Sequence, residues 1–162
     1  MNEIAPHLNP LTDGVWSAEG AEFRRAAVLD IAALQLGITD PKQYWLEAFG
    51  QLPQTDYQKL AWCGVFALWC LRTAGLTDWH WVSGVGFLLN HGADGLNHIT
   101  LPEPGDVAYF DKPYAHHALV QECDGTTVKL IQGNYGLPGR VAESEVNLRT
   151  KKPIFFSIAR WL

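Results

Sequence analysis

The sequence predicts an α+β fold, in which helices from the N-terminal half pack on an antiparallel sheet formed by the C-terminal half. Two observations support this. Apolar residues recur at helical spacing in several segments before about residue 90, whereas after Pro104 short runs rich in β-branched and aromatic residues alternate with Gly, Pro and Asp. Helices that come first along the chain and strands that come second are typical of α+β architecture.

Four segments are expected to be helical: 21–36, 41–49, 63–74 and 83–90. In the first, four apolar residues at helical spacing make the face expected to be buried: Phe23, Ala27, Ile31 and Leu34. Gly37 ends this helix and Gly75 ends the third, because glycine commonly follows the last residue of a helix. Pro41 is suited to begin the second. The segment 63–74 is strongly apolar and is expected to be the central helix.

Four segments after Pro104 are expected to be strands: 106–110, 116–123, 127–132 and 154–161. Asp124 and Gly125 mark a turn between the second and third of them. A three-residue loop, 124–126, is expected because it places Val120 opposite Leu130 and so brings the apolar residues of both strands onto one face. A two-residue loop at 124–125 would mix apolar and polar residues on that face.

The same register brings two chemically useful side chains together. It places His116 opposite Asn134, on the face that also carries Ala118 and Val120. His117 would then point to the other face. His116 is therefore expected to be the inward histidine of the pair.

Composition indicates one domain spanning 1–162, with an irregular segment at 1–18. Apolar residues make up 48% of the chain and charged residues 18%, which is typical of a globular protein. The net charge of −5 argues against nucleic-acid binding, which needs a basic surface. No apolar run is long enough to insert into a membrane, and the first residues lack the features of a signal peptide. The protein is expected to be a monomer made in the cytoplasm.

The chain has three cysteines, and they are expected to be free thiols. Cys63 and Cys70 lie on one predicted helix with Cα atoms about 10 Å apart, too far for a disulfide. Cys123 lies near the predicted hairpin turn. No Cys-x-x-Cys pair indicates zinc, so neither a metal nor another cofactor is expected.

Cys63 stands where a polar segment changes into the central apolar helix. The first turn of a helix has unpaired N–H groups and the positive end of the helix dipole, both of which favour a thiolate. Hydrolysis of an amide by a thiol also needs a base and a group that orients the base. His116 is the expected base, and Asn134 or Gln132 would accept a hydrogen bond from its far nitrogen.

Three blocks of residues resemble the CHAP and NlpC-type cell-wall hydrolases of the papain-like superfamily. The first is Trp62-Cys63-Gly64-Val65-Phe66, and the second is Pro104–Phe110 followed by His116–Val120. The third is Ile131-Gln132-Gly133-Asn134. The similarity extends over about residues 20–161. It implies a papain-like fold in which Cys63 is the nucleophile and His116 the catalytic histidine.

The resemblance implies cleavage of a peptidoglycan amide bond without a metal, either N-acetylmuramoyl–L-alanine or a bond of the stem peptide. One departure from the family bears on the third catalytic residue. CHAP proteins often have a glutamate at the position of Gln132, so with a neutral side chain there Asn134 becomes the preferred orienting residue and Gln132 the second candidate. His117 is kept as the alternative base.

Trp62, Trp79 and Trp81, together with His117, are the candidates for substrate contacts, because tryptophans can line a groove for glycan or stem peptide. The expected setting is a phage endolysin released by a holin, or an antibacterial effector delivered by a secretion system and paired with an immunity protein. It would act in the periplasm or cell wall. Two other functions stay open: an inactive relative that binds peptide or protein, and a thiol protease or deamidase that acts on proteins.

Overall fold

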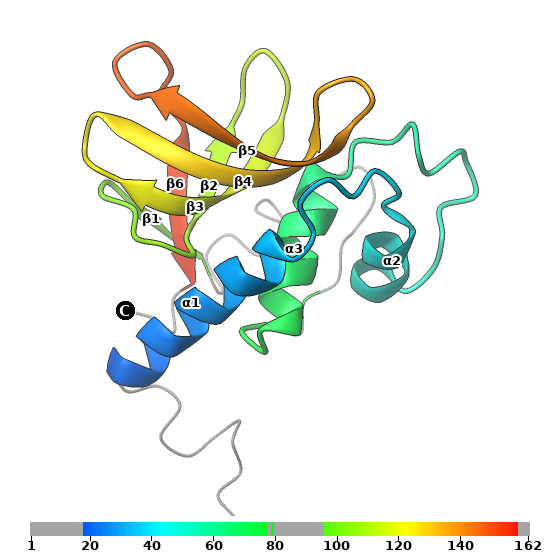
Figure 1. Ribbon diagram of the computed structural model, residues 1–162, viewed down its shortest axis with the longest axis horizontal. Helices are drawn as coiled ribbons and strands as arrows, with labels where there is room; N and C mark the ends of the chain where they lie inside the picture. The colour runs from blue at the N-terminus through cyan, green and yellow to red at the C-terminus, as the bar shows by residue number, and fades with distance from the viewer. Residues whose placement is uncertain (1–17, 78, 80–95, 159–162) are drawn as a thin grey trace, which may run out of the picture.

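The computed structural model describes residues 18–77, 79 and 96–158. The described helices are α1 (Ala18–Ala33), α2 (Lys42–Tyr44), the π-helix η1 (Trp45–Phe49) and α3 (Cys63–Thr73). The described strands are β1 (Leu96–Ile99), β2 (Val107–Phe110), β3 (His116–Cys123), β4 (Thr127–Tyr135), β5 (Arg140–Asn147) and β6 (Ile154–Ile158). The strands form one six-stranded sheet in the order β1-β6-β2-β3-β4-β5, and every pair is antiparallel. The α+β class is confirmed (Figure 1).

The helices expected at 21–36, 41–49 and 63–74 are present, and Gly75 has positive φ just after α3. Helix α1 already ends at Ala33, so Gly37, which also has positive φ, comes four residues after its end. The expected helix 83–90 lies outside the described residues. All four expected strands are present, the last described as far as Ile158, but β1 and β5 were missed. Within the described helices, none is both long and apolar enough to cross a membrane.

The buried face expected for α1 was wrong at Phe23 and Leu34, whereas Ile31 of that face is partly buried against the core. Phe23 is 76% exposed and Leu34 81%, whereas Val28 and Ala32 are fully buried. The contacting side of this helix is made of small apolar residues and of Arg25, which is only 8% exposed. The spacing of the large apolar residues indicated a different side of the helix, because a buried arginine adds nothing to a hydrophobic pattern.

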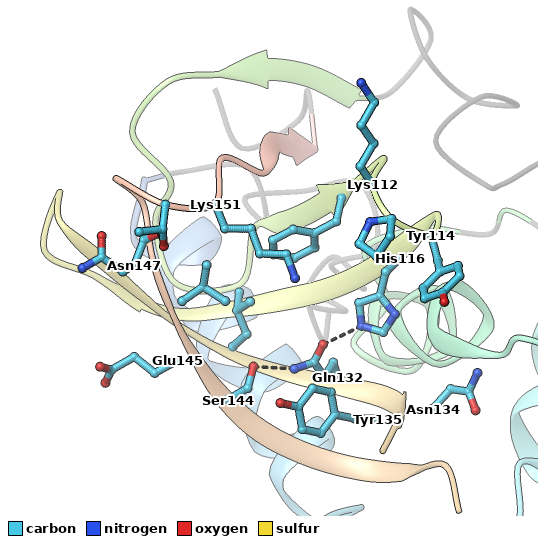
Figure 2. Close-up of a pocket in the computed structure, with 15 residues that line it drawn as sticks. Lys112, Tyr114, His116, Gln132, Asn134, Tyr135, Ser144, Glu145, Asn147 and Lys151 are labelled. Carbon is cyan, nitrogen blue, oxygen red and sulfur yellow. Dashed lines mark hydrogen bonds between the residues drawn. The ribbon is translucent and has the colours of Figure 1, made fainter. Parts of the chain in front are cut away.

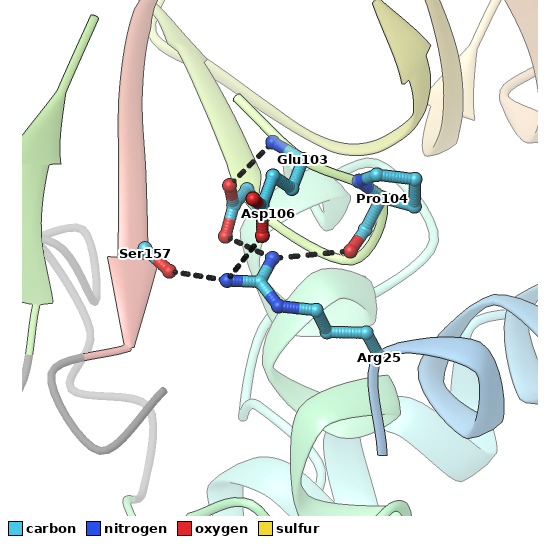
Figure 3. Close-up of polar contacts among 5 residues, drawn as sticks. All are labelled: Arg25, Glu103, Pro104, Asp106 and Ser157. Carbon is cyan, nitrogen blue, oxygen red and sulfur yellow. Dashed lines mark hydrogen bonds and ion pairs between the residues drawn. The ribbon is translucent and has the colours of Figure 1, made fainter. Parts of the chain in front are cut away.

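Arg25 holds α1 against the end of the sheet where β2 begins (Figure 3). Its guanidinium lies 2.8 Å from the Asp106 carboxylate, and it donates to Ser157 Oγ on β6 at 3.0 Å. Asp106 also accepts the backbone N–H of Glu103 at 2.7 Å. Gly105 has φ +90°, and a Cβ there would lie 3.1 Å from the Arg25 Cα. The Pro-Gly-Asp turn therefore lies directly on the backbone of α1.

The sheet carries apolar side chains on both faces. One face packs with α3 through residues such as Leu119 and Ile131, and the opposite face forms a second cluster that includes Val120 and Leu130. Both faces of β3 are therefore buried. His117 is 4% exposed, so the expectation that it points away from the core was wrong.

The pairing expected in the β3–β4 hairpin is confirmed where Val120 stands opposite Leu130. Residues 124–126 lie between the two strands, as expected. The pairing beside this loop differs from the expected register: Cys123 pairs with Val128, and the Asp124 N–H donates to the Thr127 carbonyl. A bulge between Val120 and Glu122 supplies the extra residue and restores the register that the core requires.

Candidate active site

Cys63 is the first residue of α3, and this helix is buried along most of its length. The first helical hydrogen bond runs from the Phe66 N–H to the Trp62 carbonyl at 2.9 Å. Every residue from Cys63 to Leu71 is buried, and Cys63 itself is 5% exposed. An entirely apolar helix is stable in water only when other elements surround it. The sheet and the N-terminal helices do so here (Figure 1).

A glycine on β4 lets the sheet approach the start of α3. A Cβ at Gly133 would lie 2.5 Å from a ring carbon of Trp62 and 2.7 Å from Phe66 Cβ, distances that packed side chains do not tolerate. Only a residue without a side chain fits at this contact. Gly133 thus permits the close packing of β4 on the helix start that carries Cys63.

The Cys63 thiol lies against the backbone of β3. Three N–H groups are close enough to lower the pKa of the thiol: those of His117, Gly64 and Cys63 itself. His117 is adjacent in sequence to His116. The structure therefore brings the sulfur to the strand that carries the paired histidines.

The place where the sulfur meets β3 is the end of the β3–β4 pairing. Val120 donates its N–H toward β2, to the Asp106 carbonyl. Successive N–H groups of a strand point to opposite sides, so that of His117 points toward β4. The described pairing between β3 and β4 ends at Leu119 and Ile131. The thiol therefore accepts a hydrogen bond from the His117 N–H, which lies beyond the last β3–β4 pair.

Burial raises the pKa of Cys63 above its ordinary value, and this effect exceeds the lowering by the three N–H groups. The expectation that the helix start yields a thiolate was therefore wrong for the free protein. A helix dipole contributes about 0.3–1 kcal/mol, and up to about 2 kcal/mol in favourable geometry. Desolvation of an almost fully buried thiolate is the larger effect here.

His116 is held by a side chain on the neighbouring strand (Figure 2). Its Nε2 and the Oε1 of Gln132 lie 2.5 Å apart. A carboxamide oxygen only accepts hydrogen bonds, so Nε2 carries the proton and Nδ1 is left as the basic nitrogen. Burial lowers the pKa of His116 and Lys151 lowers it further, while the Gln132 hydrogen bond raises it.

Gln132 has this role in place of Asn134, which the sequence favoured. Asn134 lies in a register shift between β4 and β5 and has φ +56°. This backbone turns its side chain away from the imidazole, as Figure 2 shows. The other end of the Gln132 carboxamide donates a hydrogen bond to Ser144 Oγ on β5.

His117 is a buried residue of the helix-facing side of β3. Its ring packs on Tyr109 with centroids 5.0 Å apart. Burial, and next the neighbouring His116, lower its pKa to about 3. His117 is 4% exposed, so the free structure gives no support to the expected contact between its ring and a substrate.

The tryptophans expected to contact substrate are not arranged as one groove. Trp62 is 1% exposed and packs against Tyr44 and Phe66 in the core, so its proposed substrate contact was wrong. Trp79 is half-buried, and its carbonyl accepts a hydrogen bond from Arg72. Trp81 lies outside the described residues.

A cavity of about 470 Å³ opens beside His116. Gln132, Asn134 and Ser144 also line it, together with two lysines and two tyrosines: Lys112, Lys151, Tyr114 and Tyr135. Its size is within the range of small-ligand sites. Ser144 was missed by sequence reasoning because β5 was not expected, and no motif singled out the tyrosines or lysines. Among the described residues, no group of three His, Cys, Asp or Glu side chains is arranged to hold a metal ion.

The fold places this chain in the papain-like class of α+β proteins. Within that class, residues 55–134 match the family model of the CHAP domain. The match includes the start of α3, the histidine pair and β4 as far as Asn134. Searches of curated proteins and of solved structures returned no match to the chain.

Proposed function

We propose that this protein is a peptidoglycan hydrolase that cleaves an amide bond, with Cys63 as nucleophile and His116 as general base and acid. One observation carries the proposal: the thiol lies against β3 at His117, while the adjacent His116 is held through Nε2 by Gln132. The match to the CHAP family model supports peptidoglycan as the substrate. The bond is either N-acetylmuramoyl–L-alanine or one within the stem peptide.

The chemistry begins with a protonated thiol and a neutral imidazole. His116 Nδ1 accepts the proton of Cys63 as the sulfur attacks the amide carbonyl, and the backbone N–H of Cys63 stabilises the oxyanion. His116 then gives that proton to the leaving amine, and the carbon–nitrogen bond breaks to leave a thioester. A water molecule, deprotonated by His116, attacks the thioester and releases the acid and the thiol.

The setting belongs to the same proposal. The substrate lies in the cell wall, and the protein reaches it as a phage endolysin released by a holin, which we prefer, or as an effector delivered by a secretion system. Synthesis of the protein with and without export to the periplasm of a test bacterium separates a wall target from a cytoplasmic one. Lysis only in the exported case supports the wall.

Digestion of purified sacculi, followed by mass spectrometry of the products, tests the reaction. The native protein is expected to release fragments with defined new ends, and these name the bond. Cys63→Ala should release none above background. Cys70→Ala is the matched control, because Cys70 is fully buried in the same helix and has no proposed catalytic role. Release by the native protein that does not exceed release by Cys63→Ala contradicts the proposal.

Gly133→Ala should lower activity while the protein still folds. The added methyl group meets Trp62 and Phe66 and pushes β4 from the start of α3, which shifts Cys63 relative to the sheet. Overpacking costs about 1–3 kcal/mol of stability. A displacement near 1 Å at a reacting group costs about 100-fold in rate. Sacculus digestion and thermal unfolding measure the two effects.

Gly125→Ala is the control for stability alone. Gly125 has φ +83° at the hairpin turn and no atom within 4 Å of its would-be Cβ, so alanine there strains the backbone without displacing a neighbour. This variant should lose stability and keep its activity at temperatures where it is folded. Equal activity losses in both variants would argue against a positioning effect of Gly133.

A further inference from the structure

The Gln132 carboxamide has two different ends, and their orientation determines which imidazole nitrogen is basic. Its oxygen faces His116 Nε2 and its NH₂ group donates to Ser144 Oγ. If the carboxamide were reversed, NH₂ would face Nε2, and that nitrogen would have to be the acceptor. The imidazole proton would then be on Nδ1, which is the nitrogen required as the base.

The glutamine differs in this respect from a glutamate at the same position. Either oxygen of a carboxylate accepts a hydrogen bond from Nε2, so its rotation does not change the tautomer. A glutamine needs a second contact to distinguish its ends. Gln132 is 3% exposed, so water competes little for the hydrogen bonds of its carboxamide. Loss of one partner would leave a buried polar group without a hydrogen bond.

The sheet register supplies this second contact from β5. Ser144 stands opposite Leu130, which is two residues along β4 from Gln132, and Gln132 stands opposite Ala142. Alternate residues of a strand share a face, so Ser144 and Gln132 point to the same side of the sheet as His116. Figure 2 shows the three side chains in one row across β3, β4 and β5.

We propose that Ser144 is a positioning residue that orients the Gln132 carboxamide and thereby keeps the His116 proton on Nε2. The proposal of this role for catalysis rests on the proposed function. The three groups form one chain of hydrogen bonds, and reversal at Gln132 would require Ser144 and His116 to change their roles together. Without the hydroxyl, the carboxamide can turn independently and present NH₂ to Nε2.

Nitrogen NMR of the imidazoles tests the tautomer whether or not the protein is an enzyme. The spectra are recorded in ¹⁵N-histidine-labelled protein carrying Cys63→Ala, at a pH where His116 is neutral, and His116→Gln identifies the signals. Native Ser144 should give the tautomer with the proton on Nε2. Ser144→Ala should give a mixture of tautomers, and Ser144→Thr, which keeps the hydroxyl, should restore the native spectrum. An unchanged spectrum in Ser144→Ala overturns the proposal.

Activity on sacculi provides a second readout. Ser144→Ala should lower the rate about tenfold, the scale of one hydrogen bond, in the native background. In the Gln132→Glu background, Ser144→Ala should lower the rate only slightly, because either oxygen of a carboxylate can accept the hydrogen bond from Nε2. A structural role alone would cost the same in both backgrounds, and that result would contradict the proposal. If native protein is inactive on sacculi, the proposed function fails, while the NMR result still decides the role of Ser144 at His116.

Ser144→Ala should also move the acid limb of the pH–rate profile to lower pH. The Gln132 hydrogen bond raises the pKa of His116, while burial and Lys151 lower it. A carboxamide that is not held in place gives less of this raising effect. Loss of packing alone would lower the rate without moving the limb, so an unmoved limb counts against the positioning role.

Discussion

The Cys63 thiol will be protonated at pH 7, and its thiolate absorbance near 240 nm will develop only above the pH at which an ordinary cysteine ionises. Burial raises the pKa of this thiol despite the helix start and the N–H of His117. An ordinary cysteine, with a pKa of about 8.5, is about 3% ionised at pH 7, so Cys63 should fall below about 3%. Burial and Lys151 also lower the pKa of His116, which disfavours an imidazolium partner.

The measurement is the difference in absorbance between native protein and Cys63→Ala across the pH range. The tyrosines and Cys123 are present in both proteins, so their ionisation cancels. A band that persists to acidic pH would show a preformed thiolate–imidazolium pair and would contradict the prediction. In that case the sulfur would attack as a thiolate that is already present, and His116 would not act as a general base in the first step.

The sequence predicted the parts of the fold whose pattern is local. The start of α3 at Cys63 and the limits of β3 follow from abrupt changes in polarity and from turn residues. Strand β5 (Arg140–Asn147) was missed because most of its residues are charged or polar and its few apolar residues do not alternate with them, at the edge of the sheet. Edge strands carry charge on their solvent side, which weakens the hydrophobic signal of a strand.

The site was predictable in its residue types and less so in its contacts. The pairing of Val120 with Leu130 followed from the apolar pattern, and it brings β4 beside His116. The choice between Gln132 and Asn134 depended on a register shift and a positive φ at Asn134, which no residue pattern indicated. The pKa of Cys63 depends on how deeply the thiol is buried, and its position at the start of a helix does not indicate that depth.

Acidification is expected to destabilise the protein through His117. Burial holds the pKa of His117 at about 3 in the folded state, whereas an unfolded chain has a histidine pKa of about 6.5. As the pH falls below 6.5, His117 therefore binds a proton in the unfolded state but not in the folded state, and the free energy of unfolding decreases. The loss continues until the pH reaches about 3, and its full size is about 5 kcal/mol.

His117→Phe isolates this contribution. Phenylalanine keeps an aromatic ring against Tyr109, where the native centroids are 5.0 Å apart, and takes up no proton. Urea unfolding followed by tryptophan fluorescence gives the free energy of unfolding of both proteins from pH 7.5 to pH 4. At pH 7.5 their difference reports packing alone. Below pH 6.5 the native curve should fall more steeply, by up to about 1.4 kcal/mol per pH unit, because His117 adds one proton to the difference between the states. Parallel curves over this range would mean that the folded protein accommodates a protonated His117, and the assignment of the acid sensitivity to its burial would be wrong.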